Sequence, residues 1–150
     1  MPPASRINLG ALGKEPGFLL RLAQLQAYSI VLEGLDPGGL RPGAFSVLYL
    51  IAQNPGMRQG TLAKHLLIKR AQMTKLVQAL AAQNLVARSV PAGDRRGVEL
   101  ALTPAGAALL AAHAPRFLAQ GDAALPGLSA GETRTLKTLL AKTLGLQVAL

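Results

Sequence analysis

Two groups of basic and amide side chains hold most of the chemistry that this sequence could perform. One is a set of six polar or basic residues interleaved with apolar ones: Lys69, Arg70, Gln72, Thr74, Lys75 and Gln78. The other is the triplet Asp94-Arg95-Arg96, which stands between two apolar runs. Such side chains can donate hydrogen bonds to phosphates and base edges, and a face without carboxylates does not repel phosphates. The pattern favours nucleic-acid binding, although a solvated helix face and an ordinary polar turn contain the same residue types.

The positive charge of the chain is concentrated around these two groups. The 150 residues carry a net charge of +9, and the stretch 58–96 holds eight basic residues against one acid, Asp94. A localised basic surface is typical of a protein with a polyanionic partner. A generally basic protein that coats nucleic acid or docks an acidic partner, without sequence-specific regulation, remains the alternative.

Residues for other kinds of chemistry are scarce. The chain has no cysteine, and its two histidines, His65 and His113, have no carboxylate or second histidine at helical spacing. No phosphate-binding glycine loop or nucleophile motif occurs. We therefore expect no catalytic residues, no metal and no cofactor, and we predict that the protein is not an enzyme. Without a signal peptide or a long apolar run, a cytoplasmic location without membrane contact is expected.

Local signals predict the elements that must position the basic residues. Two helices at 59–66 and 69–83, about three residues apart, suit a helix-turn-helix, with Ile68, Met73, Leu76, Val77 and Leu80 as the buried stripe. Strands are predicted at 85–90 and 98–102, and Thr103-Pro104 starts a helix in which Pro115 should cause a kink or a break. Further helices are expected at 16–36, at 42–53 and after a capping box at Ser129 and Glu132.

These residues also resemble a known family. The segments LA at 62–63, MTKLV at 73–77, QNLVAR at 83–88, DRR at 94–96 and LTPAG at 102–106 are similar to the MarR family of bacterial transcription regulators. The likeness extends over about 16–146. Four positions depart from the family pattern. Arg41 and Ala44 stand where a threonine and a glutamine are common, and Leu67 and Lys69 stand where a glycine and a serine are common. Lys69 cannot cap a helix N-terminus, and its charge opposes the helix dipole.

The resemblance implies a mainly α protein with a small β wing. It implies one domain over 1–150, with a loose arm at 1–15, a winged helix-turn-helix at 40–104 and dimerisation helices at 16–36 and 103–146. The implied function is a homodimeric repressor on a palindromic operator in double-stranded DNA. The implied wing contact is Arg96 in the minor groove, with Arg95 secondary and Asp94 shaping the tip.

Members of such a family are often released from DNA by small aromatic or phenolic compounds. A pocket of that kind could be lined by Tyr28, Phe45 and Tyr49, with Arg21 or His113 facing a carboxylate. We prefer the simpler interpretation that the aromatic residues belong to the core. For dimerisation, the alternative is that the outer helices pack within one subunit. A winged helix needs only part of this chain, however, so a partner subunit is the economical way to bury their apolar faces.

Overall fold

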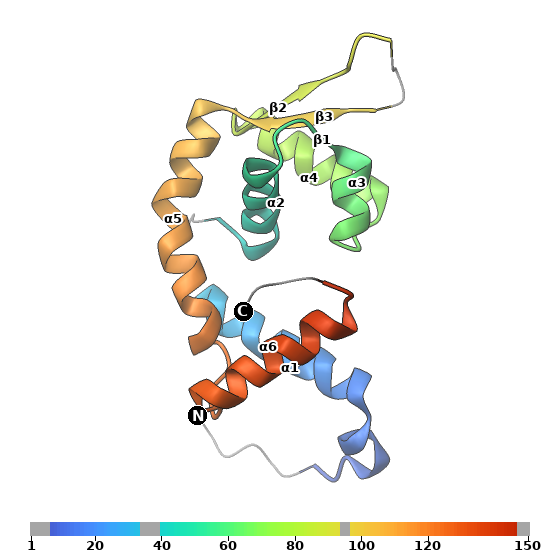
Figure 1. Ribbon diagram of the computed structural model, residues 1–150, viewed down its shortest axis with the longest axis vertical. Helices are drawn as coiled ribbons and strands as arrows, with labels where there is room; N and C mark the ends of the chain where they lie inside the picture. Colours follow the sequence, from blue (N-terminus) through green and yellow to red (C-terminus); the bar gives the residue numbers. More distant parts are fainter. Residues whose placement is uncertain (1–6, 34–39, 94–96, 147–150) are drawn as a thin grey trace. The chain divides into compact units, whose positions relative to one another are not determined.

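The structure is a computed structural model that describes residues 7–33, 40–93 and 97–146. The described part is mainly helical with one small sheet (Figure 1). No helix in these ranges is long and apolar enough to cross a membrane. The elements in chain order are a 3-10 helix η1 (Gly10–Lys14), α1 (Pro16–Glu33), α2 (Pro42–Gln53), β1 (Met57–Arg58), α3 (Gln59–His65), α4 (Arg70–Ala82), β2 (Val86–Ser89), β3 (Glu99–Leu102), α5 (Pro104–Ala123) and α6 (Ala130–Thr143).

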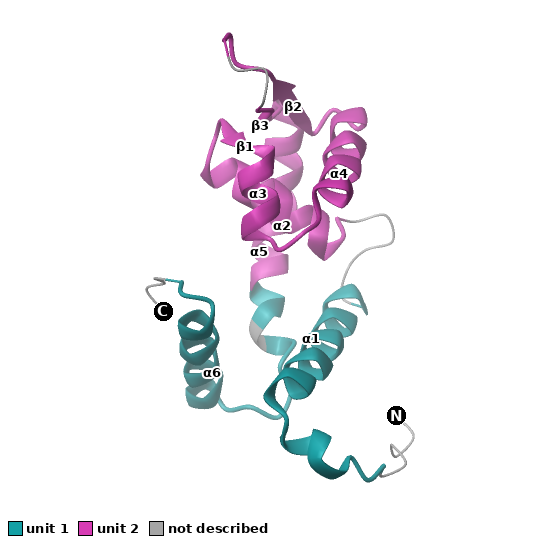
Figure 2. Cartoon of the chain, turned by 90° about the vertical axis from the view of Figure 1, so that its right-hand side faces the viewer, with its two compact units in different colours: residues 1–34, 119–150 teal, residues 35–118 magenta. Residues whose placement is uncertain are grey.

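The chain divides into two compact units (Figure 2). One unit is Leu35–Leu118, which holds α2 to β3 and most of α5. The other combines Met1–Gly34 with Ala119–Leu150 and therefore holds η1, α1, the end of α5 and α6. The segment predicted as a winged helix-turn-helix, 40–104, thus falls within the larger unit, whereas the helices predicted for dimerisation divide between the units, with α1 and α6 in the smaller one and most of α5 in the larger one.

The sheet contains three strands in the order β1-β3-β2, whereas the sequence predicted two. β2 pairs antiparallel with β3, from Val86 opposite Leu102 to Ser89 opposite Glu99. β1 is only two residues long and pairs with the other edge of β3. It follows a turn at Gly56, whose φ of 79° suits glycine and whose amide donates to the carbonyl of Leu100 at 3.0 Å. Two residues are too few to show strand periodicity, so β1 left no pattern to detect.

The core of the larger unit is formed by the apolar faces of α2, α3, α4 and β3. Its most buried side chains are Val47, Leu48, Ile51, Leu62, Met73, Val77 and Leu100. The stripe predicted for α4 is confirmed, because Met73, Val77 and Leu80 are buried while Ile68 and Leu76 pack partly against them. β2 and β3 lie side by side next to α4 and the end of α2 (Figure 1). Packing of this apolar stripe leaves the opposite, polar face of α4 toward solvent.

The start of α5 confirms the helix start predicted at Thr103-Pro104. The Thr103 hydroxyl accepts a hydrogen bond from the amide of Gly106 at 3.0 Å and donates one to the carbonyl of Asn84. The Thr103 amide donates to the carbonyl of Leu85 at 3.1 Å. One threonine therefore caps α5 and joins it to the segment that links α4 with β2.

Of the kink or break predicted at Pro115, the break does not occur, because α5 runs without interruption from Pro104 to Ala123. Proline removes one backbone donor, so the carbonyl four residues earlier, at Ala111, loses its helical partner. Ala111 is exposed, so water can hydrate that carbonyl. The remaining hydrogen bonds of a 20-residue helix are then enough to keep it helical on both sides of the proline.

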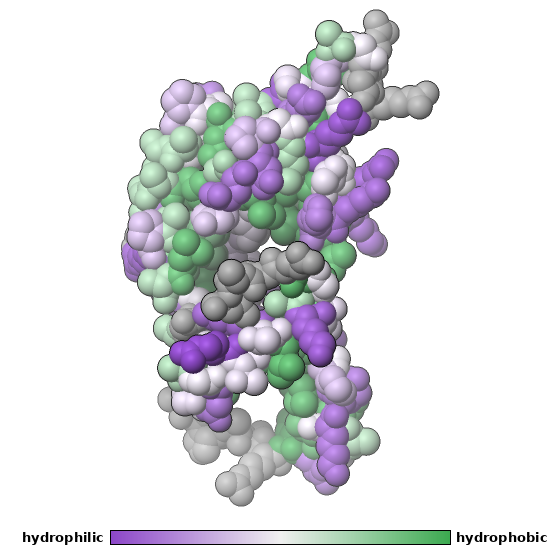
Figure 3. Space-filling view, viewed as in Figure 1, coloured by the Kyte–Doolittle hydropathy of each residue, from purple (hydrophilic) through white to green (hydrophobic). Residues whose placement is uncertain are grey.

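The smaller unit has almost no core of its own. No residue of α1 is buried, and Thr133 is the only buried residue of α6. Large side chains are instead exposed, including Leu19, Leu22 and Leu25 on α1 and Leu139 on α6. Figure 3 shows hydrophobic side chains at the surface of these helices. The predicted capping box of α6 is confirmed, with the Ser129 hydroxyl and the Glu132 side chain each bonded to the other residue's amide.

Candidate nucleic-acid interface

The outward face of α4 carries the six side chains that the sequence singled out. Five of them are exposed: Lys69, Arg70, Gln72, Lys75 and Gln78. Lys69 occupies the N-cap position and makes no capping hydrogen bond with its side chain. A cation near the positive end of a helix dipole costs about 0.3–1 kcal/mol. An anion bound beside Lys69 would turn that cost into an attraction.

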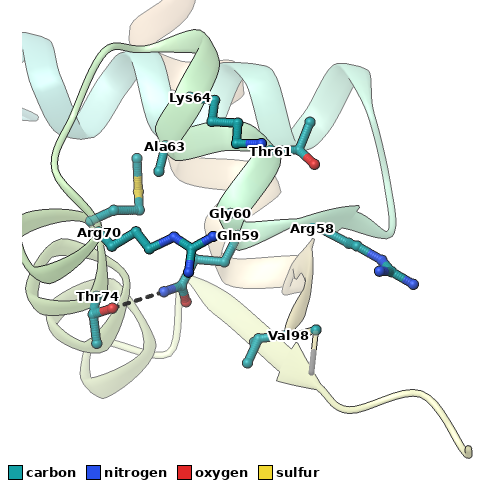
Figure 4. Close-up of a pocket in the computed structure, with 11 residues that line it drawn as sticks. Arg58, Gln59, Gly60, Thr61, Ala63, Lys64, Arg70, Thr74 and Val98 are labelled. Carbon is teal, nitrogen blue, oxygen red and sulfur yellow. Dashed lines mark hydrogen bonds between the residues drawn. The ribbon is translucent and has the colours of Figure 1, made fainter. Parts of the chain in front are cut away.

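Thr74 differs from the other five because it is half-buried and already bonded. The Nε2 atom of Gln59 on α3 donates to the Thr74 hydroxyl at 3.0 Å (Figure 4). A hydroxyl that accepts a hydrogen bond still has its own proton to donate. The bond therefore ties α3 to α4 and leaves Thr74 able to donate to an acceptor on a ligand.

A polar cavity of about 330 Å³ opens at this junction between α3 and α4. Figure 4 shows that its walls come from β1, α3, α4 and the segment before β3. Three of its side chains are cationic and none is a carboxylate, which suits an oxyanion such as a backbone phosphate. The lining residues are Arg58, Gln59, Gly60, Thr61, Ala63, Lys64, Arg70, Met73, Thr74, Gly97 and Val98.

Four lining residues with polar or charged side chains were missed as site candidates from the sequence: Arg58, Gln59, Thr61 and Lys64. Arg58 and Lys64 contributed to the basic stretch, but nothing in their spacing tied them to α4. Gln59 is separated from its partner Thr74 by 15 residues, so no local pattern could reveal the bond. The available signal was the absence of acids, because 37–93 contains seven basic residues and no Asp or Glu.

The wing is described only at its base. The predicted tip residues Asp94, Arg95 and Arg96 lie outside the described residues. At the base, a side chain added at Gly97 would meet the guanidinium of Arg58 at 3.4 Å from its Nε atom. Arg88 on β2 is exposed and lies opposite Leu100 of β3. Basic side chains therefore border the wing as well as α4.

Comparison with known proteins places the chain in a family. Residues 38–97 match the model of the MarR family. A regulatory protein for the hcr operon of Thauera aromatica is 33% identical over 132 residues, which cover 87% of this chain and 80% of that protein. The chain belongs to the MarR family. Proteins of this family are DNA-binding transcriptional regulators and not enzymes, as the sequence predicted.

Solved MarR-like structures match almost the whole chain. The transcriptional repressor CouR, solved bound to a 23-mer DNA duplex, is 33% identical with a TM-score of 0.78, covering 93% of this chain and 99% of CouR. BpsR of Bordetella bronchiseptica is 28% identical with a TM-score of 0.78, covering 85% of this chain and 96% of BpsR. The mainly helical fold with a small antiparallel sheet is therefore the MarR winged-helix fold.

The residues predicted to bind a small ligand divide between the two units. Arg21 and Tyr28 are exposed on α1, whereas Phe45, Tyr49 and His113 belong to the larger unit. Phe45 is 4% exposed and stacks on Phe117 at a centroid distance of 3.8 Å and on Tyr49 at 5.6 Å. This stacking favours a core role for Phe45. No group of three or more potential metal ligands occurs within the described ranges.

Proposed function

We propose that this protein is a homodimeric repressor that binds a palindromic operator through α4 and the wing. The observation that supports it best is the carboxylate-free polar face of α4, continuous with the basic cavity between α3 and α4. The comparison supports it too, because the similar protein CouR was solved as a repressor on a DNA duplex. A regulator of this kind works where the chromosome lies, which in a bacterium is the cytoplasm.

Each side chain of the interface has a proposed role. Lys69 and Arg70 at the start of α4 bind phosphates, and their charge sets the orientation of the helix on the duplex. Gln72, Thr74, Lys75 and Gln78 follow on the same face and are suited to base edges in the major groove, where amides pair with adenine and cations with guanine. At the wing, Arg96 enters the minor groove, Arg95 assists and Asp94 shapes the tip.

The exposed apolar side chains of the smaller unit are the basis for proposing a dimer. α1 and α6 are apolar enough to need a covering surface, yet they bury almost nothing within the chain. A second copy offers the same surface, which suits a two-fold symmetric interface. Two copies would present two α4 helices, and half-sites read this way lie about one helical turn apart.

Release by a small aromatic acid is the second part of the proposal. The structure of BpsR concerns the regulation of its DNA binding by 6-hydroxynicotinic acid. For this chain, we propose only the class of ligand, a small aromatic carboxylate, because the residues predicted to bind it divide between the two units and Phe45 belongs to the core. A thermal-shift panel of aromatic carboxylates tests this, and a compound that raises the melting temperature should also lower DNA affinity. No shift across the panel would remove this part of the proposal.

Selection of bound duplexes from a random pool tests the main proposal. The selected duplex should contain an inverted repeat and bind far more tightly than a random duplex at the same salt concentration. Affinity should fall steeply with salt, with a slope of about −0.9 per neutralised phosphate. Equal affinity for selected and random duplexes would instead favour a basic protein that binds nucleic acid without sequence-specific regulation.

A further inference from the structure

The helices α3, α4 and α6 end in the same backbone motif, closed by three different residues. In each case, the residue after the C-cap has a positive φ, and its amide and the next one bond back to carbonyls of the last helical turn. This is the Schellman motif, which most often has glycine at the left-handed position. The three residues are Leu67 with φ 54°, Asn84 with φ 58° and Gly145 with φ 65°.

Leucine is the unfavourable member of this set. Glycine adopts the left-handed conformation without steric cost, and asparagine tolerates it. Leucine places its Cβ too close to the following carbonyl oxygen. The side chain of Leu67 gains nothing within the fold to offset this strain, because it is 85% exposed, more than any other large apolar side chain in the described ranges. A strained residue that packs against nothing in its own chain points to a contact outside it.

The surroundings of Leu67 select the kind of partner. Lys64 precedes it, Lys69 and Arg70 follow it, and all three cations are exposed. With no acid anywhere in 37–93, a second copy of this surface or another basic protein would be repelled. A suitable partner is a polyanion that also offers apolar carbon between its charges. The deoxyribose of a DNA backbone has this composition, since each sugar lies between two phosphates.

The place of Leu67 in the fold agrees with a backbone contact. In a helix-turn-helix, the second helix lies in the major groove while the first crosses the sugar-phosphate backbone. Leu67 lies in the turn between those two helices, three residues before the start of α4 at Arg70. Arg70 and Lys64 line the basic cavity beside this turn. The turn therefore belongs to the backbone-facing edge of the proposed DNA surface and not to its base-reading face.

We infer that Leu67 packs against a backbone deoxyribose while the neighbouring cations hold the adjacent phosphates. This rests on the proposed function, since it requires that α3 and α4 meet DNA. The contact carries no sequence information, so it adds affinity for any duplex. It also gives a role to an exposed, strained leucine at a position where glycine would make a more stable protein.

The test replaces Leu67 with glycine and measures stability and DNA affinity separately. Leu67→Gly should raise the melting temperature, by up to about 6 °C, because the relief of backbone strain exceeds the entropy that glycine adds to the unfolded chain. The same variant should bind both the selected duplex and a random duplex about three- to tenfold more weakly. This loss is expected when the apolar area that the Leu67 side chain buries against the sugar is removed. The salt slope should be unchanged because no charge is removed. Fluorescence anisotropy at several salt concentrations provides the affinities and slopes.

Asn84→Gly is the matched control, because it changes the same backbone position at the other end of α4. It should leave both the melting temperature and the two affinities close to those of the wild type. If Leu67→Gly raises the melting temperature but binds both duplexes as the wild type does, the inference is wrong while the proposed function stands. A loss confined to the selected duplex, or a change in the mass measured by light scattering, would also overturn it. If the wild type shows no preference for the selected duplex, the proposed function fails. In that case, an equal loss of affinity for both duplexes in Leu67→Gly still supports the sugar contact.

Discussion

Gly106 joins α5 to the base of the wing more closely than any side chain would allow. A Cβ added there would lie 2.0 Å from the carbonyl oxygen of Leu85 and 2.9 Å from its carbonyl carbon. Real Cβ atoms essentially never approach closer than 3.0 Å, so Gly106→Ala must move α5 or β2 by about 1 Å. Both contacts are with backbone, and no flexible side chain can give way.

The expected cost follows from the interactions at this junction. A shift of this size strains two hydrogen bonds. The Gly106 amide donates to the Thr103 hydroxyl at 3.0 Å, and the Thr103 amide donates to the Leu85 carbonyl at 3.1 Å. Each is worth about 1 kcal/mol, and overpacking adds about 1–3 kcal/mol. The lower entropy of an unfolded alanine chain returns about 0.4–1 kcal/mol. Gly106→Ala should therefore lower the free energy of unfolding by about 2–5 kcal/mol, a large part of a typical 5–15 kcal/mol.

Gly131→Ala is the matched control for this prediction. Gly131 also lies in the first turn of a helix, α6, but an added Cβ there meets nothing within 4 Å. Its substitution should be neutral or stabilise the protein by up to about 1 kcal/mol. Urea unfolding followed by circular dichroism measures both variants. A Gly106→Ala variant as stable as Gly131→Ala would refute the argument that this glycine is required by the close approach of Leu85.

Three further changes test the interface and the helix ends. Arg96→Ala should weaken DNA binding at least several-fold in anisotropy titrations without changing the melting temperature, and unchanged affinity would remove Arg96 from the site. Thr74→Val keeps the shape but leaves the Gln59 amide without its acceptor, so we expect a loss of about 1–3 kcal/mol in unfolding free energy, together with weaker DNA binding; full stability would contradict the Gln59 bond. The Ser129 amide and hydroxyl lower the pKa of Glu132, so its stabilising effect is present above its ordinary pKa and is lost as the pH falls through the lowered one. The stability advantage of wild type over Glu132→Gln should therefore shrink on acidification, and a constant difference would argue against this role.

Much of the fold was predictable because its signals are local. The hydrophobic stripe at Met73, Val77 and Leu80 repeats within a single helix, so periodicity alone identified the buried face of α4. Thr103 before a proline and Ser129 three residues before a glutamate are short capping patterns, and both form the hydrogen bonds expected of them. The uneven distribution of charge also needs no structure, and it indicated the class of partner.

The errors arose where distant parts of the chain decide the outcome. β1 exists only because β3 supplies its hydrogen bonds, and two residues are too few to show the alternating pattern of a strand. α5 continues past Pro115 because the other hydrogen bonds of a long helix outweigh the loss of one donor. A rule applied to the proline alone does not include the length of the helix. Among the predicted DNA-binding residues, Thr74 appeared equivalent to its neighbours until the bond from Gln59 showed that it also holds α3.

The sequence by itself determined the charge pattern, the capped helix starts and the buried face of α4. These properties depend on residue types at spacings of a few positions, and the interactions that express them, hydrophobic packing of one helix face and capping hydrogen bonds, are local. Only the tertiary structure decided which polar residues meet. It brought Arg58, Lys64 and Arg70 around one cavity and left Leu67 exposed in a strained turn beside them. Such juxtapositions depend on how α3 packs against α4 and on which carbonyls the turn between them satisfies, and neither is encoded in any single stretch of the chain.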